Sequence, residues 1–193
     1  MKKIGLYFGT FNPIHKGHLT LGNYFSKHTD LDEVWFVVTV QNPFKANDAL
    51  LEDNHRLKMV RLALEDQNNL KVCAIEFSLP TPSYTIDTLD HIVKMYPNEQ
   101  FVLLMGEDNL IYFDKWKKYQ RILDLVQLYV YPRKHEIAVP EAIIKHYKIQ
   151  VVNAPKLDFA SENIRRILSE GNSAEALMPP GSWEYLNEKG FYK

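Results

Sequence analysis

The chain has 193 residues, of which 46% are hydrophobic and 24% are charged, close to the usage of ordinary globular proteins. This composition excludes a disordered or fibrous chain, and the length suits one domain with a buried core. Lysine and arginine number 23 against 24 acidic residues, and the resulting net charge of -1 argues against nucleic acid as a partner.

The chain also lacks the sequence features of a membrane or secreted protein. No segment approaches the roughly 20 apolar residues that a membrane span needs. The apolar stretch 4–8, which follows Lys2 and Lys3, is too short for a signal peptide. Cys73 is the only cysteine, so the chain can form no intrachain disulfide and no cysteine cluster for zinc or iron. We therefore expect a cytoplasmic protein.

Short apolar runs rich in β-branched and aromatic residues recur along the chain and predict strands. They lie at residues 4–8, 34–40, 71–75, 100–105, 125–131 and 149–152. Between them, apolar residues recur with helical spacing, as at Leu57, Val60 and Leu64. This alternation of strand and helix predicts an α/β fold with a Rossmann-like, doubly wound parallel sheet.

The last third of the chain changes character. Residues 161–170, 173–177 and 183–189 are predicted to form helices, with turns between them. Gly190 suits a left-handed cap after the last of these helices. We predict a single domain over residues 1–193, made of a Rossmann-like core at 1–158 and a small C-terminal helical appendage at 159–193.

The fold class indicates where a site should lie. In open parallel sheets, ligands bind beyond the carboxyl ends of the strands. The stretches that follow the predicted strands, all of them polar or glycine-rich, are residues 9–18, 41–45, 76–85, 106–116 and 153–161. We therefore expect the functional residues to lie in these stretches.

The first of these stretches carries two histidines at a strand-to-helix junction. Gly9 lets the backbone come close to a ligand after the first strand. His15 and His18 follow at the helix entry, where their spacing lets both imidazoles face one side. Since a helix N-terminus attracts anions, the pair predicts a phosphate site. Alone, the pair would fit an incidental arrangement or half of a metal site, but no cysteine or nearby His-carboxylate set completes a zinc site.

Two cationic residues at the same sheet edge have both a functional and an ordinary interpretation. Ser161 suits a helix N-cap, and Arg165 lies one turn along on the accessible side, where it could clamp phosphates. Lys45 follows the second strand and could also meet a phosphate. The alternative for each of them is a common cap or a solvated cation.

Residues after the third and fourth strands are similarly open to two interpretations. Ser83 or Thr85 could cap the helix that begins there. Asp108 could accept hydrogen bonds from ribose hydroxyls, and Trp116 offers an aromatic face on which a ligand ring could stack. The alternatives are a helix cap for Asp108 and a core aromatic for Trp116.

Several motifs resemble a known family. The stretch GTFNPIHKGHL resembles the HxGH signature of the nucleotidylyltransferases related to class I aminoacyl-tRNA synthetases. PSYTIDTL at 82–89, GED…FDKW at 106–116 and the Ile-Arg motif at 159–165 are similar to nicotinate-nucleotide adenylyltransferases. The family usually has a glycine where Phe8 stands, an aspartate where Asn12 stands and a threonine where Glu162 stands. The resemblance spans nearly the whole chain.

This resemblance implies that ATP reacts with nicotinate mononucleotide to give deamido-NAD and pyrophosphate. It implies ATP-binding roles for Gly9, Thr10, Phe11, His15, His18, Gly106, Asp108, Ser161 and Arg165. Mononucleotide binding falls to Lys45, Tyr84, Thr85 and Trp116, and catalytic charge stabilisation to His15, His18, Lys45 and Arg165. The protein would provide no metal ligand, and Mg²⁺ would be held mainly by the ATP phosphates.

Other functions fit parts of the same pattern. Nicotinamide mononucleotide and phosphopantetheine are alternative acceptors within the superfamily, although PSYTIDTL and Trp116 favour a pyridine nucleotide. A non-catalytic nucleotide-binding module would keep the fold and lose the reaction, but His15, His18, Ser161 and Arg165 are all present. The sequence leaves open whether the protein forms a homo-oligomer.

Overall fold

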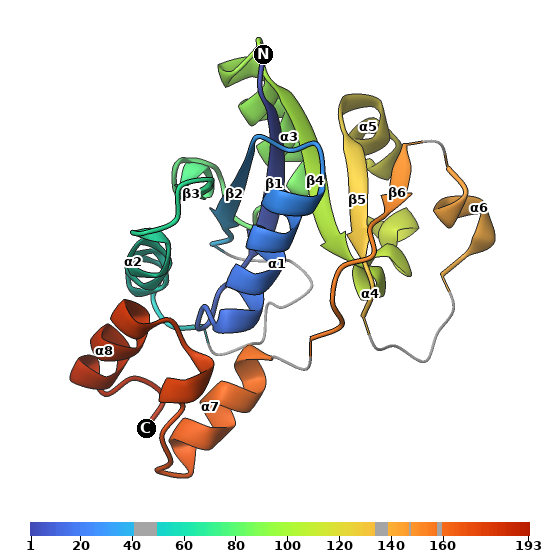
Figure 1. Cartoon of the computed structure of the whole chain (residues 1–193). Helices are drawn as coiled ribbons and strands as arrows, with labels where there is room; N and C mark the ends of the chain where they lie inside the picture. The colour runs from blue at the N-terminus through green and yellow to red at the C-terminus, as the bar shows by residue number, and fades with distance from the viewer. Residues whose placement is uncertain (41–49, 134–138, 147, 158–159) are drawn as a thin grey trace.

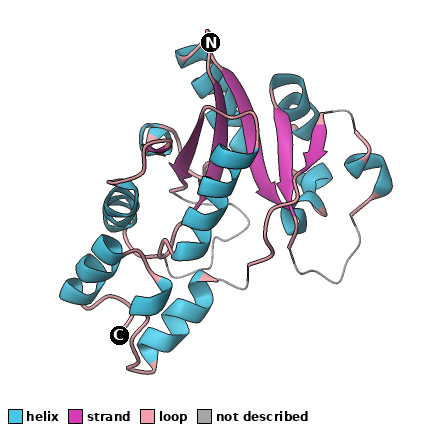
Figure 2. Ribbon diagram, viewed as in Figure 1, coloured by secondary structure: helices cyan, strands magenta, loops and turns pink. Residues whose placement is uncertain are grey.

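The computed structural model describes residues 1–40, 50–133, 139–146, 148–157 and 160–193. In this part of the chain, strands form one parallel sheet with the order β3-β2-β1-β4-β5-β6. The strands are β1 (Lys3–Gly9), β2 (Glu33–Val38), β3 (Leu70–Cys73), β4 (Gln100–Gly106), β5 (Gln127–Tyr131) and β6 (Ile149–Val151). Figure 2 shows them running in the same direction. The predicted Rossmann-like sheet is confirmed.

Helices cover both faces of the sheet, as Figure 1 shows. On one face α1 (Lys16–His28) and α2 (Asp53–Leu64) pack against the sheet, and on the other α3 (Thr85–Met95) and α5 (Tyr119–Leu125) do so. The central strands are mostly apolar because their side chains alternate between two buried faces, as Leu6 and Tyr7 of β1 do. Shorter elements are η2 (Ile75–Ser78), α4 (Glu107–Leu110), η3 (Phe113–Lys115) and α6 (Glu141–Ile144).

The C-terminal elements are α7 (Ser161–Ser169), η4 (Glu175–Leu177) and α8 (Pro180–Lys189). Ile164, Leu168 and Leu186 join the same buried cluster as α1 and α2. The buried Ser182 hydroxyl donates a hydrogen bond to the Met59 carbonyl, 2.7 Å away, which ties α8 to α2. Gly190 has a φ of 67° and forms the predicted left-handed cap. The proposed boundary between residues 158 and 159 lies outside the described residues.

Several predicted element bounds were wrong by a few residues. The strand predicted at 125–131 begins at Gln127, because Leu125 ends α5. The strand predicted at 71–75 ends at Cys73, since Ile75 begins η2. The second strand ends at Val38 rather than residue 40, and the helix expected at 173–177 is only the short η4. In the first two cases one apolar run spans two elements that share a core, so the run does not mark the junction.

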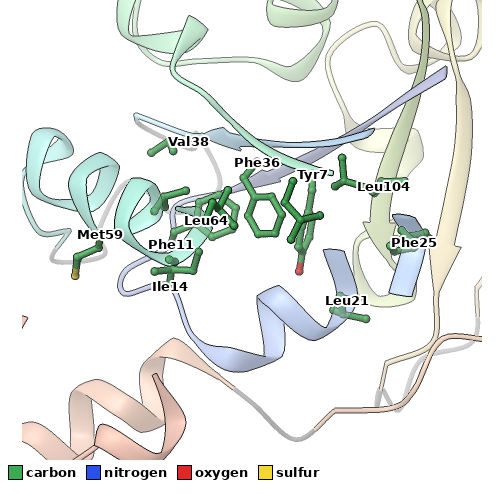
Figure 3. Close-up of a cluster of buried hydrophobic side chains, with 14 of the residues drawn as sticks. Tyr7, Phe11, Ile14, Leu21, Phe25, Phe36, Val38, Met59, Leu64 and Leu104 are labelled. Atoms are coloured by element: carbon green, nitrogen blue, oxygen red, sulfur yellow. The ribbon is translucent and has the colours of Figure 1, made fainter. Parts of the chain in front are cut away.

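The core on the α1 and α2 side extends into the loop after β1. Figure 3 shows Phe11 in the same cluster of buried side chains as Tyr7 and Phe36. Phe11 is buried, and its ring centroid lies 5.5 Å from that of Phe36. A side chain at Gly9 would place its Cβ 2.8 Å from the Phe11 ring. The glycine is therefore required by this close packing, which anchors the loop at the carboxyl edge of the sheet.

Among the described residues, no helix combines the length and apolar character that crossing a bilayer requires.

Candidate functional site

Two adjoining cavities open at the carboxyl edge of the sheet. The first cavity, about 470 Å³, is bounded by the start of α3, by α4 and by the residues around η3. The second cavity, about 460 Å³, is bounded by the starts of α1 and α7. Residues that line both cavities are Tyr7, Phe8, Gly9, Thr10, Asn109 and Tyr131. They come from β1 and the loop after it, from α4, which follows β4, and from the end of β5. The strand order reverses between β1 and β4, where ligands of this fold bind.

The paired histidines lie at the start of α1, in the second cavity. His15 is the N-cap residue, and its ring stacks on that of His18 with centroids 3.7 Å apart. The backbone N–H of His15 donates to Nδ1 of His18 over 3.2 Å. Because Nδ1 accepts this bond, the neutral His18 ring carries its proton on Nε2. The predicted pairing of the two imidazoles is confirmed, and His18 has a defined donor atom.

His15 is the more buried of the two, with 4% of its surface exposed. Burial and the nearby positive charge of Arg133 lower the pKa of His15 to about 4. The ring is therefore neutral near pH 7 in the structure, where it can donate one hydrogen bond to a phosphate without carrying a charge.

The lowered pKa of His15 predicts a loss of stability in acid. The unfolded chain binds a proton at this residue near pH 6.5, whereas the folded chain does so only near pH 4. The part of the unfolding free energy that depends on a neutral His15 is fully present above about pH 6.5 and is lost as the pH falls toward 4. Between about pH 7.5 and 5, we expect wild type to lose about 2 kcal/mol more unfolding free energy than His15→Gln. Urea unfolding at both pH values measures the difference, and equal losses in the two proteins would contradict it.

The start of α7 docks on the histidine loop. The Ser161 hydroxyl donates to the Pro13 carbonyl over 2.9 Å, and Nη1 of Arg165 donates to the Asn12 carbonyl over 2.8 Å. The prediction that Ser161 is the N-cap was wrong, since Ala160 occupies that position and Ser161 is the first helical residue. Its hydroxyl is used in the tertiary contact instead. Ser161 and Arg165 also line the second cavity, as their predicted role requires.

Gly106 and Asp108 lie on the side of the first cavity. Asp108 Oδ2 is 3.6 Å from Nε of Arg133, a residue that lines the second cavity. Gly106 and Asp108 were predicted to bind ATP, yet both line the first cavity and neither lines the second; Asp108 reaches the second cavity only through its contact with Arg133. Sequence reasoning missed Arg133, although its place just after β5, at the same edge of the sheet, was a usable signal.

The other predicted residues of the mononucleotide site line the first cavity. Trp116 lies next to Phe113, with ring centroids 5.6 Å apart, and lines the cavity together with Tyr84 and Thr85. Nζ of Lys117 lies 4.3 Å from the centroid of the Tyr84 ring. Capping of α3 by a serine or threonine was a wrong prediction, since Tyr84 is the N-cap residue and no side chain caps the helix. Lys45 lies outside the described residues.

A fully buried arginine lies beneath the loops that line the cavities. Arg56 of α2 has 0% of its surface exposed. Its guanidinium donates to the carbonyls of Thr10, Thr39 (2.7 Å), Val40 (3.1 Å) and Leu51 (3.0 Å) and forms an ion pair with Asp53. It thereby joins the ends of β1 and β2. Sequence reasoning gave Arg56 no role.

A buried carboxylate lies on the other side of the same strand end. Glu76 accepts hydrogen bonds from the Thr88 hydroxyl over 3.0 Å and from the Val40 backbone N–H over 3.4 Å. Burial raises the pKa of Glu76, while these hydrogen bonds and the Arg56 charge oppose the shift. Arg56 and Glu76 therefore hold Val40 from both sides.

Comparison with known proteins gives concordant results. The model of the Cytidylyltransferase-like family matches residues 6–167. The chain is 48% identical to a Flavobacterium johnsoniae protein over 99% of both chains, and 44% identical to one of Christiangramia forsetii over 100% of this chain and 99% of that one. Both relatives are named "Probable nicotinate-nucleotide adenylyltransferase". In fold, the chain is similar to the Plasmodium falciparum nicotinic acid mononucleotide adenylyltransferase complexed with NaAD, with a TM-score of 0.82, 21% identity and coverage of 100% and 98%.

Proposed function

This chain belongs to the cytidylyltransferase-like family and, within it, to the nicotinate-nucleotide adenylyltransferases, and from that premise we propose how its site works. It joins ATP and nicotinate mononucleotide to give deamido-NAD and pyrophosphate, a step of NAD biosynthesis. The observation that carries the mechanism is that the two cavities meet at Gly9 and Thr10. We also propose that the enzyme works in the cytoplasm, which suits a chain whose single cysteine allows no intrachain disulfide.

The chemistry of the two cavities assigns one substrate to each. The second cavity contains the helix N-terminus of α1, His15, His18 and Arg165, all of which suit the triphosphate of ATP. The first cavity contains Trp116, Tyr84 and Thr85, which suit a pyridine ring and its ribose. Asp108 lines the first cavity beside Arg133 of the second, and its carboxylate can accept hydrogen bonds from a ribose hydroxyl.

The proposed reaction is one in-line displacement. An oxygen of the acceptor 5′-phosphate attacks the α-phosphorus of ATP, the bond from that phosphorus to the oxygen bridging to the β-phosphorus breaks, and pyrophosphate leaves. The protein aligns the two anions and stabilises the developing negative charge, so no covalent intermediate is needed. His18 donates from Nε2, His15 and Arg165 donate alongside it, and Lys45 is proposed to bind the acceptor phosphate.

Magnesium fits this site as a cation that ATP carries. No group of three or more His, Cys, Asp or Glu side chains comes together within the part of the chain that the structure describes. The histidines offer nitrogen, whereas Mg²⁺ prefers oxygen ligands. We propose that the phosphate oxygens hold Mg²⁺, which when bound offsets the charge of the triphosphate.

Trp116→Ala tests the assignment of the first cavity. Loss of a stacking face weakens binding by about 1–3 kcal/mol per base, so we expect KM for nicotinate mononucleotide to rise about tenfold or more. KM for ATP should change little, because Trp116 does not line the second cavity. Steady-state kinetics with each substrate varied in turn measures both values. An unchanged KM for the mononucleotide would contradict stacking on Trp116.

The proposed function is tested with MgATP and one acceptor at a time. We expect pyrophosphate release with nicotinate mononucleotide and much less with nicotinamide mononucleotide or phosphopantetheine. Faster pyrophosphate release with either of those acceptors would show that it, and not nicotinate mononucleotide, is the preferred substrate. Binding of ATP with no release from any acceptor would favour a non-catalytic nucleotide-binding module.

A further inference from the structure

The C-terminal end of the chain reaches the histidine loop. The Tyr192 hydroxyl donates a hydrogen bond to Oδ1 of Asn12, a residue 180 positions away in the sequence. Tyr192 adopts a left-handed backbone conformation with a φ of 65°, which is uncommon for a residue with a side chain. The tail itself is anchored by Phe191, whose ring centroid lies 4.7 Å from that of His55 and 6.0 Å from that of Tyr185. The Tyr192 hydroxyl therefore contributes a contact separate from that anchor.

Asn12 is the point at which several segments of the site meet. Only 2% of its surface is exposed. Besides Tyr192, its Oδ1 accepts a hydrogen bond from the Leu51 backbone N–H over 3.2 Å. Its carbonyl accepts the Arg165 bond of 2.8 Å, and the next carbonyl, of Pro13, accepts the Ser161 bond. The side chain of Asn12 thus fixes the turn on which the phosphate-binding residues of α7 dock.

The Tyr192 hydroxyl is a constant donor to this turn. Burial raises the pKa of Tyr192 well above its usual value, while the positive charges of Arg165 and Arg56 act in the opposite direction. The hydroxyl therefore keeps its proton near neutral pH and can donate the hydrogen bond to Asn12.

We propose that Tyr192 is a positioning residue for ATP, which acts through Asn12 to hold the 10–14 turn and Arg165 in the geometry that receives the triphosphate. This inference rests on the proposed function, since it assigns ATP to the second cavity. It makes the end of the chain part of the nucleotide site, although Tyr192 does not line that cavity.

Tyr192→Phe is the direct test, because it removes one hydroxyl and keeps the ring. We expect the dissociation constant of ATP and its KM to rise about tenfold, as loss of a hydrogen bond worth about 1.4 kcal/mol would cause. KM for nicotinate mononucleotide should stay within about twofold, because Asn12 and Arg165 do not line the first cavity, whose ring-binding residues lie around Tyr84 and Trp116.

Tyr185→Phe is the matched control. Its hydroxyl lies 2.8 Å from Nδ1 of His55, so the variant loses one hydrogen bond of the same C-terminal region away from both cavities. Both variants should lose a similar part of the unfolding free energy, but only Tyr192→Phe should weaken ATP binding. Equal ATP affinities in the two variants would show a merely structural role and overturn the proposal.

The route through Asn12 is tested by a double-mutant cycle. In Asn12→Ala, the further change Tyr192→Phe should leave the dissociation constant of ATP unaltered, since the partner is already lost. A full tenfold effect in that background would overturn the proposal. Calorimetric titration with ATP needs no acceptor, so it separates this inference from the proposed function, which fails if wild type releases no pyrophosphate with nicotinate mononucleotide.

Discussion

Replacing His18 with alanine is expected to lower kcat by about 10²–10³, the effect of removing one donor to a charge that develops in the transition state. Nδ1 of His18 accepts from the His15 backbone, so the neutral ring carries its proton on Nε2, and His18 lines the second cavity. The donor is fixed before ATP binds, and this preorganisation makes it effective. KM for each substrate should change much less than kcat, because the bond strengthens in the transition state.

His28→Ala is the control for this prediction. His28 is the last residue of the same helix, and its ring lies against Tyr24, with centroids 4.6 Å apart, away from both cavities. His18→Ala also removes the acceptor of the capping bond, which costs about 1 kcal/mol of stability. Thermal unfolding of both variants checks that each is folded under assay conditions. A kcat for His18→Ala near that of wild type would rule out the donor role.

Arg56→Met is expected to reduce the unfolding free energy by about 3–5 kcal/mol, the cost of breaking a buried ionic network by removing one partner. Four backbone carbonyls would lose their donor, among them those of Thr10 and Thr39. Both residues line the first cavity, so the surviving folded enzyme should also lose activity. Arg56→Lys keeps the positive charge but not the planar guanidinium group. Its unfolding free energy should therefore lie between those of wild type and Arg56→Met.

Arg61→Met provides the comparison for this prediction. Arg61 lies on the exposed side of the same helix, so its replacement should change stability by no more than about 0.5 kcal/mol. Urea unfolding of the variants and wild type measures the differences. If Arg56→Met were within about 1 kcal/mol of wild type, the buried arginine would not hold the loops together.

The sheet was predictable from the sequence because parallel strands buried on both faces leave continuous apolar runs. β1 and β4, at its centre, match the runs at 4–8 and 100–105 to within a residue at each end. The runs near β3 and β5 were less informative, since Ile75 and Leu125 are apolar residues of adjoining helices. Local patterns thus indicate which segments are buried more reliably than where one element gives way to the next.

Side chains at helix ends show a second limit of local reasoning. Ser161 and Thr85 are residue types that commonly cap a helix N-terminus, yet neither caps its helix in the structure. The Ser161 hydroxyl instead bonds to Pro13, which is distant in the sequence. Which of several possible partners a short polar side chain takes depends on tertiary packing, and the sequence of one segment does not contain it.

The site itself was predictable as far as it consists of residues that follow strands. His15 and His18 come from one loop, and their spacing already brings them together. Arg133 and Asp108 meet only because β4 and β5 are neighbours. Arg56 of α2 contacts Thr10, which lies 46 positions away in the sequence. Tyr192 contacts Asn12, which lies 180 positions away. Such long-range partners depend on the order of the strands and the packing of the C-terminal helices.

The central claim is that ATP and the mononucleotide bind in two adjoining cavities, so that the adenylyl group, with the α-phosphorus of ATP, is transferred directly to the acceptor phosphate. Incubation of the enzyme with MgATP radiolabelled at the α-phosphorus and with nicotinate mononucleotide tests it most directly. We expect the label to appear in deamido-NAD in equal amount to the pyrophosphate released, with none on the protein. Label in free AMP or ADP, or bound covalently to the chain, would contradict direct transfer between the two cavities.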